Sequence, residues 1–354
     1  MVVLNQVTLK ASQFMFGYLA GGATPFEVKD PSRNFVIAFQ VLPLIVVVSS
    51  ISALLFYWRI LPFVISILGK ILTKIFGLSG PLAFGCSATV FLGTIEAPLT
   101  VRPYLTKMSR SEVFTLICCS MSTIAGTVLV LYATVVNQVV PNATAHLLTA
   151  SVMSIPAAVI LAHVMIPPKT QSSVKTAGDV NRLTQNSAHS AMDALIQGTI
   201  DGLNMVLQIA AIIIVLFALI YLVNEALTLL PWDGITLEAL VSYPLRPFMW
   251  LIGISWSQTA WAADLMAQKI LFNEFVAFVK LSQVAESSLT NSHKVILTYG
   301  LCGFANIASS GIIIGGLTAI MPERKKEVVS LAMRSLVVGN LATLMTAGMA
   351  AIIL

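Results

Sequence analysis

Two glutamates lie in apolar segments of this chain, beside residues that interrupt helices. Glu96 lies in the segment 91–99 together with Gly93 and Pro98, and Glu274 has a similar apolar setting far along the chain. An ionisable group within the hydrocarbon layer of a membrane costs roughly 2.5–3.5 kcal/mol, so it usually marks a substrate or ion pathway. A carboxylate in such a site accepts hydrogen bonds from the hydroxyl or amide groups of a solute. The two acids therefore predict a transporter.

Both acids also have a structural interpretation, as members of ion pairs. Arg102 follows Glu96 closely enough in the sequence to neutralise it, and Lys269 and Lys280 flank Glu274. Long basic side chains near helix ends readily reach polar surroundings. The two interpretations differ in whether each carboxylate faces a solute or only a neighbouring cation.

The composition is that of a membrane protein. Hydrophobic residues make up 57% and charged residues 10% of the sequence, and the mean hydropathy is +0.90. Soluble domains carry about 25% charged residues. The net charge of +5 fits basic cytoplasmic loops, and no basic stretch alternates with aromatic residues as in a nucleic-acid reader. We expect an integral, multi-pass membrane protein that does not bind nucleic acid.

The cysteines and histidines do not form the patterns of an enzyme or a metal site. The four cysteines lie in apolar segments without CxxC spacing, and we expect them to be buried packing residues. The histidines lie mostly near predicted span ends, and no His-Glu-x-x-His motif is present. The sequence thus predicts no enzyme activity, no transition-metal site and no organic cofactor. The cysteines are Cys86, Cys118, Cys119 and Cys302.

Apolar segments long enough to cross a bilayer, which takes about twenty residues, predict about six transmembrane helices. Two further apolar segments, 81–105 and 244–278, are interrupted, the first at Gly93 and the second at Gly253 and Asp264. Halves of roughly ten residues are too short to span, so we expect two re-entrant helical hairpins. The spans are expected near residues 35–57, 113–137, 145–166, 203–229, 294–320 and 328–354.

The basic residues support this layout, because cytoplasmic loops are enriched in Lys and Arg. If both hairpins return to their side of entry, the main basic clusters share one face. Each hairpin is followed by two spans, and the two hairpins enter from opposite faces, which gives inverted repeats. The prediction is an all-α polytopic membrane protein with interfacial helices and a substrate site near the midplane. The basic clusters lie at 59–74, 102–110, 169–182 and 324–326.

Polar residues inside the predicted spans add candidates for the site. Hydroxyl groups in the uncharged span 113–137 can simply bond back to their own helix. The segment 304–311 is a stronger signal, because an asparagine beside two serines and a glycine predicts an unwound helix that faces a ligand. Packing between helices is the alternative there. The hydroxyl residues of the uncharged span are Ser120, Ser122, Thr123 and Thr127.

With these motifs the chain resembles the concentrative nucleoside transporter family. The matching segments are 91–105 (FLGTIEAPLTVRPYL), 269–278 (KILFNEFVAF) and 301–316 (LCGFANIASSGIIIGG), supported by 39–43 (FQVLP) and 333–347 (MRSLVVGNLATLMTA). The resemblance covers essentially the whole chain. It implies elevator-type symport of nucleosides with Na⁺ or H⁺ by a homotrimer in the plasma membrane, which is the inner membrane in bacteria.

The resemblance also implies roles for individual residues, carried over by motif position. The residues that would face the nucleobase are Gly93, Thr94, Ile95, Glu96 and Thr127. Those that would bind or adjoin the ribose are Glu274, Phe304, Asn306 and Ser309. The coupling cation, if it is Na⁺, would be held by Thr89, Leu92, Ser122 and Thr123.

A division into a scaffold and a mobile transport domain follows from the same resemblance. Each half of the transport domain would contain one hairpin and two helices. The expected segments are 1–34 (interfacial helix and loop), 35–80 (scaffold transmembrane helix and linker), 81–168 (first half of the transport domain), 169–240 (interfacial helix and scaffold transmembrane helix) and 241–354 (second half).

The sequence departs from the family pattern in three places. Thr89 stands where asparagine is common, which replaces a carbonyl ligand for sodium by a hydroxyl and gives weight to proton coupling. The segment 93–96 reads Gly-Thr-Ile-Glu instead of the common Gly-Gln-Thr-Glu, so the base preference does not carry over. Gln258 stands where an acid is common.

The chain also begins where family members usually have additional spans before the interfacial helix. This start fits either a truncated product or a reduced member, and in both cases we expect the two hairpins and the two acids to be intact. The alternatives to nucleoside uptake are transport of a related solute, such as a nucleobase or a modified nucleoside, or an inactive truncated member.

Overall fold

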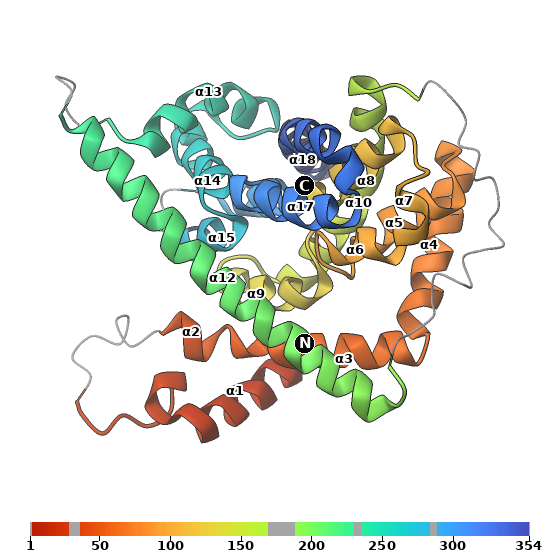
Figure 1. Cartoon of the computed structure of the whole chain (residues 1–354). Coiled ribbons are helices and arrows are strands. Elements are labelled where there is room, and N and C mark those ends of the chain that lie inside the picture. The colour runs from red at the N-terminus through yellow and green to blue at the C-terminus, as the bar shows by residue number, and fades with distance from the viewer. Residues whose placement is uncertain (1, 28–35, 169–187, 230–234, 284–288, 354) are drawn as a thin grey trace. The chain divides into compact units, whose positions relative to one another are not determined.

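The structure is a computed structural model that describes residues 2–27, 36–168, 188–229, 235–283 and 289–353 (Figure 1). Every regular element in these ranges is a helix, which confirms the predicted all-α fold. Part of the segment 169–240, including the basic cluster at 169–182, lies outside the described residues. Helices long and apolar enough to cross a membrane run over Ala38–Tyr57, Arg110–Val136, Ala143–Met165, Ala191–Leu227 and Pro322–Ile353.

The predicted span near 294–320 is not continuous. Its two parts are α16 (Asn291–Leu301) and α17 (Ile307–Ile320), separated by a short non-helical segment. This confirms the unwound helix predicted from the polar residues around Asn306. The span that begins at Arg110 is likewise made of two helices, α8 (Arg110–Ser122) and α9 (Gly126–Val136).

The described residues belong to two compact units. The first comprises Met1–Pro62 and Asn186–Ile214, and the second comprises Phe63–Gln185 and Val215–Leu354. In the first unit α3 packs closely on the beginning of α12. A Cβ atom added to Gly198 would lie only 2.6 Å from the Cβ atom of Ala53. Small residues of this kind let two helix backbones approach each other. The elements of this unit are α1 (Val2–Phe16), η1 (Gly17–Ala20), α2 (Ile37–Gln40), α3 (Pro43–Tyr57) and the first part of α12 (Ala191–Leu227).

The second unit repeats one order of elements: a short helix, a helical hairpin, an interrupted helix and a long helix. This order confirms the internal repeat read from the sequence. The first series is α4 (Ile60–Phe76), α5 (Gly80–Ala88), α6 (Glu96–Thr100), α7 (Arg102–Leu105), α8, α9 and α10 (Ala143–Met165). The second series is α13 (Leu237–Leu251), η4 (Trp256–Gln258), α14 (Thr259–Leu271), α15 (Glu274–Ser282), α16, α17, η5 (Pro322–Arg324) and α18 (Lys325–Ile353).

The second hairpin differs from the prediction. Asp264, expected to interrupt it, lies inside α14, where its carboxylate pairs with Lys280 of α15 at 2.5 Å. The break falls instead at Phe272 and Asn273, and the Asn273 side chain accepts the Val276 N–H to begin α15. An asparagine at the N-cap favours the start of a helix at the next residue. An aspartate whose charge is paired can stay inside a helix without ending it. The hairpin is therefore the α14–α15 pair, and the turn at Gly253 precedes it.

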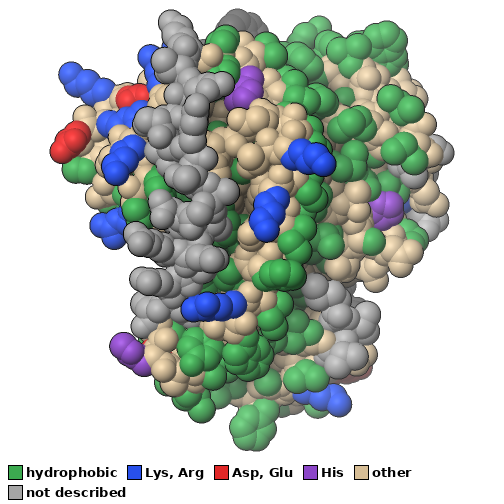
Figure 2. All heavy atoms as spheres, turned by 90° about the vertical axis from the view of Figure 1, so that its right-hand side faces the viewer, with side chains coloured by type: hydrophobic (Ala, Val, Ile, Leu, Met, Phe, Trp, Pro, Cys, Tyr) green, Lys and Arg blue, Asp and Glu red, His purple; other side chains and the backbone are tan. Residues whose placement is uncertain are grey.

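The segment 35–80, predicted to contain one span and a linker, also holds the amphipathic helix α4. Ile65 and Leu72 belong to the hydrophobic core of the second unit, whereas Phe63, Ile67 and Ile71 are exposed. An apolar stripe at helical spacing next to lysines is typical of a helix that lies at a membrane surface. Sequence analysis missed this helix. Apolar side chains also cover much of the face shown in Figure 2.

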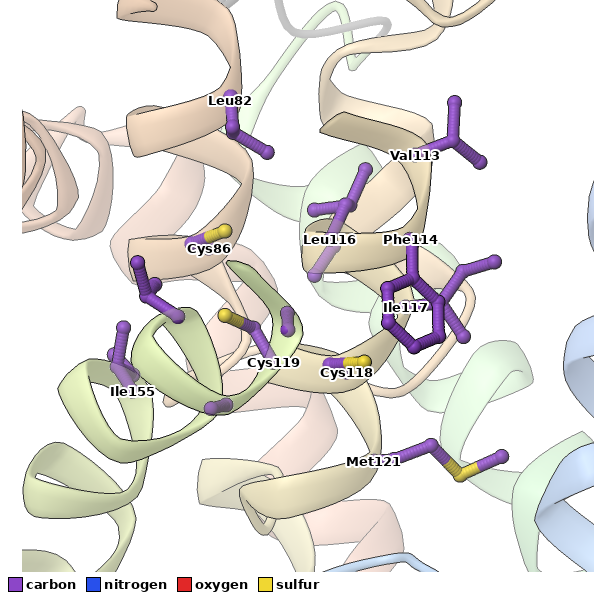
Figure 3. Packing of buried hydrophobic residues seen from close by; sticks show 14 of the residues in the cluster. Leu82, Cys86, Val113, Phe114, Leu116, Ile117, Cys118, Cys119, Met121 and Ile155 are labelled. Carbon is purple, nitrogen blue, oxygen red and sulfur yellow. The ribbon is translucent and has the colours of Figure 1, made fainter. Parts of the chain in front are cut away.

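Helix α8 forms the centre of the core of the second unit. Its residues pack against α5 on one side and α10 on the other: Leu116 faces α5 near Leu82 and Cys86, and Cys119 lies beside Ile155 of α10 (Figure 3). Cys86 of α5 and Cys119 of α8 are buried in this packing (Figure 3). All four cysteines are free and buried, which confirms the prediction that they are packing residues.

The two interrupted helices meet at their interruptions. The N–H of Phe304, between α16 and α17, donates to the Thr123 carbonyl oxygen at the end of α8, at 3.3 Å. A Cβ atom on Gly303 would lie 2.7 Å from the Thr343 methyl carbon and 2.9 Å from the Ser122 carbonyl oxygen. Only glycine therefore fits at position 303 without moving its neighbours.

We expect Gly303→Ala to destabilise the protein by about 1–3 kcal/mol, because it overpacks this contact. Thermal unfolding of the purified protein in detergent measures the change. The matched control is Gly311→Ala in α17, where an added Cβ atom meets nothing within 4 Å. Equal unfolding temperatures for the two variants would contradict the close approach of the interruptions.

Candidate functional site

Glu274 is the first residue of α15 and is buried, with 3% of its surface exposed. Its Oε1 atom accepts a hydrogen bond from the Tyr132 hydroxyl of α9 at 2.6 Å, and its Oε2 atom accepts one from the Asn306 amide nitrogen at 2.8 Å. Tyr132 in turn packs against the rings of Phe275 and Phe278. A buried charge is tolerated only when it is hydrogen-bonded or paired, and both oxygens of this carboxylate have a donor.

Asn306 connects this carboxylate to the interrupted helix. It is the N-cap of α17, where its Oδ1 atom accepts the Ser309 N–H at 2.7 Å while its amide nitrogen donates to Glu274. The capping bond satisfies one of the backbone donors that every helix start leaves open. The orientation of the Asn306 amide is thus fixed from both ends, and Ser309 is held one turn into the same helix.

The acid of the first hairpin has the corresponding position. Glu96 is the first residue of α6, and its Oε2 atom accepts the Gly93 N–H at 3.0 Å. The neighbouring Ile95 packs on α17, where a Cβ atom on Gly316 would lie 2.6 Å from the Ile95 side chain. The predicted base-facing segment 93–96 therefore forms the turn of the first hairpin and contacts the helix that begins at Asn306.

Three of the four residues predicted to hold a sodium ion, Thr89, Ser122 and Thr123, lie near the meeting point of the interrupted helices. The Thr123 hydroxyl lies within hydrogen-bond distance of two carbonyl oxygens that can accept its proton, that of Cys119 at 2.9 Å and that of Thr89 at 3.2 Å. The Thr89 hydroxyl donates to the Cys86 carbonyl oxygen at 2.7 Å. Ser122 follows the same pattern, with a bond to its own helix at 3.2 Å. These hydroxyls and carbonyls are the hard oxygen atoms that suit Na⁺.

The other predicted residues are Leu92, Thr127 and Phe304. Leu92 is partly buried in the turn after α5, and its N–H donates to Ala88 at 2.9 Å. Thr127, in the first turn of α9, has a buried hydroxyl without a hydrogen-bond partner among the described residues. Phe304 is partly buried and is held through its N–H. Glu96 and Glu274 thus belong to two groups, and the turn that contains Glu96 contacts α17 through Ile95 and Gly316.

Of the two lysines that could form an ion pair with Glu274, Lys280 has a different partner. Lys280 pairs with Asp264 at 2.5 Å. Lys269 is completely buried, and its ammonium group donates to the Gly300 carbonyl oxygen and to the Thr343 hydroxyl, each at 3.0 Å. Among the residues that the structure describes, no three His, Cys, Asp or Glu side chains gather closely enough to hold a metal ion.

Sequence analysis missed Tyr132 as a member of the site. Tyr132 is the one aromatic residue of the stretch 126–136 and offers a signal, since a buried phenol hydroxyl usually has a hydrogen-bond partner. The partner itself, Glu274, lies 142 positions away in the sequence. No local pattern in the chain connects the two.

The geometry defines an all-α membrane protein whose buried polar site lies at interrupted helices, which is the architecture of a secondary transporter. Two family models match the chain: "Na+ dependent nucleoside transporter C-terminus" over residues 146–351 and "Nucleoside recognition" over residues 38–139. The chain belongs to the concentrative nucleoside transporter family, whose members are transporters and not enzymes.

Relatives and solved structures agree with this assignment. The putative nucleoside permease NupX of Escherichia coli is 32% identical, over 96% of this chain and 81% of its own length. Solute carrier family 28 member 3 of Rattus norvegicus is 33% identical, over 96% of this chain. The structure of CNTnw in an inward-facing substrate-bound state has a TM-score of 0.87 at 31% identity, and covers 99% of this chain and 83% of that chain. This chain spans about half the length of the mammalian relatives, 50% for the rat protein.

We expect Tyr132→Phe to cost about 1–3 kcal/mol of stability, because it leaves one oxygen of a buried carboxylate without its donor. Chemical or thermal unfolding in detergent tests this. Tyr243→Phe is the control, since the Tyr243 side chain is exposed at 74%. If both variants unfold like the wild type, the bond to Glu274 contributes nothing to the fold.

Proposed function

We propose that this chain takes up nucleosides in symport with a cation. The observation that carries the proposal is the buried Glu274 carboxylate, held by Tyr132 and by the N-cap Asn306 of an interrupted helix. The names of the relatives support the solute class, since they include a nucleoside permease of Helicobacter pylori and a sodium/nucleoside cotransporter of Rattus norvegicus.

Glu274 is the proposed acceptor for the ribose hydroxyls. An ionised carboxylate offers about four acceptor positions, and the protein donors Tyr132 and Asn306 occupy two of them. The remaining positions suit two neighbouring hydroxyl groups of a sugar. Ser309, one turn into α17, adds a hydroxyl beside the Asn306 cap, and Phe304 supplies an aromatic ring just before it. A site of this kind rejects analogues without the hydroxyls, because the acid is then left unpaired.

The turn of the first hairpin is the proposed contact for the nucleobase. Glu96 is held on one oxygen by the Gly93 N–H, and Thr94 and Ile95 lie between them. The Thr127 hydroxyl is buried without a protein partner in the described part of the chain, and a buried polar group of this kind suits a ligand. Whichever base is preferred, its polar edge would meet a carboxylate and a hydroxyl.

The coupling ion is proposed to bind at Thr89, Leu92, Ser122 and Thr123. Sodium is the first candidate, because the matching family model is described as Na⁺-dependent and because Thr123 already touches the Thr89 carbonyl. The set contains no carboxylate, so it would supply only neutral oxygen ligands. Proton coupling through a glutamate is the second candidate, since Thr89 provides a hydroxyl in place of an amide carbonyl.

The proposed mechanism is an elevator movement of the hairpin-containing domain within a homotrimer of the plasma membrane. CNTnw has been solved in inward-facing, intermediate and outward-facing states, and all of them resemble this chain, with TM-scores from 0.85 to 0.88. The expected segments 81–168 and 241–354 would move, and the segments 35–80 and 169–240 would supply the scaffold. Transport of a related solute, a nucleobase or a modified nucleoside, is the alternative function.

We expect Glu274→Gln to abolish uptake of uridine and adenosine while the protein still reaches the membrane, because an amide offers fewer acceptor positions and no charge. Radiolabelled uptake in cells without other nucleoside transporters measures this, with membrane content followed by immunoblotting. Glu323→Gln, at an exposed position before α18, is the control. Normal uptake by the Glu274 variant would remove the ribose-binding role.

Uptake should also depend on a cation gradient. In proteoliposomes we expect an inward sodium gradient at constant pH, or an inward proton gradient without sodium, to stimulate uridine accumulation. Thr89→Asn should increase the apparent sodium affinity, since it adds a carbonyl ligand. Uptake that responds to neither gradient would show a facilitator or channel.

A further inference from the structure

Lys269 is a buried cation that the proposed transport mechanism does not use. It lies in α14 of the second hairpin and none of its surface is exposed. Burying an ammonium group is unfavourable unless its charge is matched and its N–H groups are bonded. Its two hydrogen-bond acceptors, the Gly300 carbonyl and the Thr343 hydroxyl, are both neutral. The position of these acceptors indicates what the lysine does.

The Gly300 carbonyl oxygen does not accept the backbone hydrogen bond that it would accept in a continuous helix. In an α-helix it would accept the N–H of the residue four positions later, which is Phe304. Helix α16 ends at Leu301, and the Phe304 N–H donates instead to the Thr123 carbonyl oxygen at 3.3 Å. The Lys269 ammonium group donates to the Gly300 carbonyl oxygen in place of the Phe304 N–H, at 3.0 Å. A cation is also favoured at the C-terminal end of a helix, where the helix dipole is negative.

Helix α18 holds the other side of the same interruption. The Thr343 hydroxyl accepts from Lys269 and donates to the Asn340 carbonyl oxygen at 3.0 Å. The Asn340 amide nitrogen donates to the carbonyl oxygen of Ala305 at 2.9 Å. The non-helical segment between α16 and α17 is therefore fixed at Gly300 and at Ala305, immediately before the Asn306 that bonds to Glu274.

We propose that Lys269 is a positioning residue of the substrate site, which fixes the end of α16 and so orients Asn306 toward Glu274. The inference rests on the proposed role of Glu274 and Asn306 in binding the ribose. Lys269 and Glu274 stand on either side of the two-residue break between α14 and α15. The lysine thus supports the acid through the geometry of Asn306.

The test compares uridine with 2′,3′-dideoxyuridine, which lacks the 2′- and 3′-hydroxyls of the ribose, in proteoliposomes with equal amounts of transporter. In the wild type we expect uridine to be preferred. Lys269→Met should reduce that preference by roughly tenfold or more, mainly through the KM for uridine, because the hydrogen bonds to the hydroxyls are weakened. Lys269→Arg should restore part of the preference. Lys280→Met is the matched control, since Lys280 lies in the same hairpin but is partly exposed and pairs with Asp264.

A purely structural lysine gives a different result: the maximal rate falls equally for both solutes, and the preference stays at the wild-type value. That outcome would overturn the inference. Thr343→Val provides a second variant should Lys269→Met fail to fold, since it removes one acceptor of Lys269 and keeps the side-chain volume. It should reduce the preference in the same direction, and an unchanged preference in this variant also overturns the inference.

The proposed function is tested separately by Glu274→Gln. If that variant transports uridine normally, the ribose-binding role fails. If it loses transport while the Lys269 and Thr343 variants keep the wild-type preference, the ribose-binding role stands and only the positioning role of Lys269 fails.

Discussion

Peptide groups freed where a helix is interrupted inside a membrane protein need partners from the protein, because no bulk water reaches them. In the part of the chain that the structure describes, two helices are interrupted, after Ser122 and after Leu301, and the interruptions meet. The Phe304 N–H bonds to the Thr123 carbonyl oxygen across the contact. Gly303 allows the approach, since a side chain there would collide with Thr343 and Ser122. The candidate site depends on this contact.

Once the Phe304 N–H is diverted, the remaining backbone groups need other partners, and buried polar side chains supply them. Lys269 bonds to the Gly300 carbonyl and Asn340 to the Ala305 carbonyl. Asn306 then caps the next helix and reaches Glu274 with its amide nitrogen. The polar side chains whose burial in apolar surroundings costs the most free energy are therefore the ones that hold the interrupted backbone in one conformation.

The two hairpins place their acids in corresponding positions but in different surroundings. Each has its acid as the first residue of the returning helix, Glu96 in α6 and Glu274 in α15. A negative side chain is favoured there, because the start of a helix carries a partial positive charge. The surroundings differ: Glu96 is partly exposed and bonds within its own turn to Gly93, whereas Glu274 is buried and bonded to two other helices. This difference fits the proposed division between base and ribose.

The sequence by itself determined the class of fold and the chemically important residues. Long uncharged segments require membrane helices, and Glu96, Glu274 and Asn306 stand out because polar groups are costly in such segments. It placed one break wrongly at Asp264, because the compensating partner Lys280 lies on the next helix and no local pattern shows it. It also missed Tyr132, whose partner is 142 residues away. The tertiary structure decided which groups satisfy one another, since buried hydrogen bonds depend on helices far apart in the sequence meeting at their interruptions.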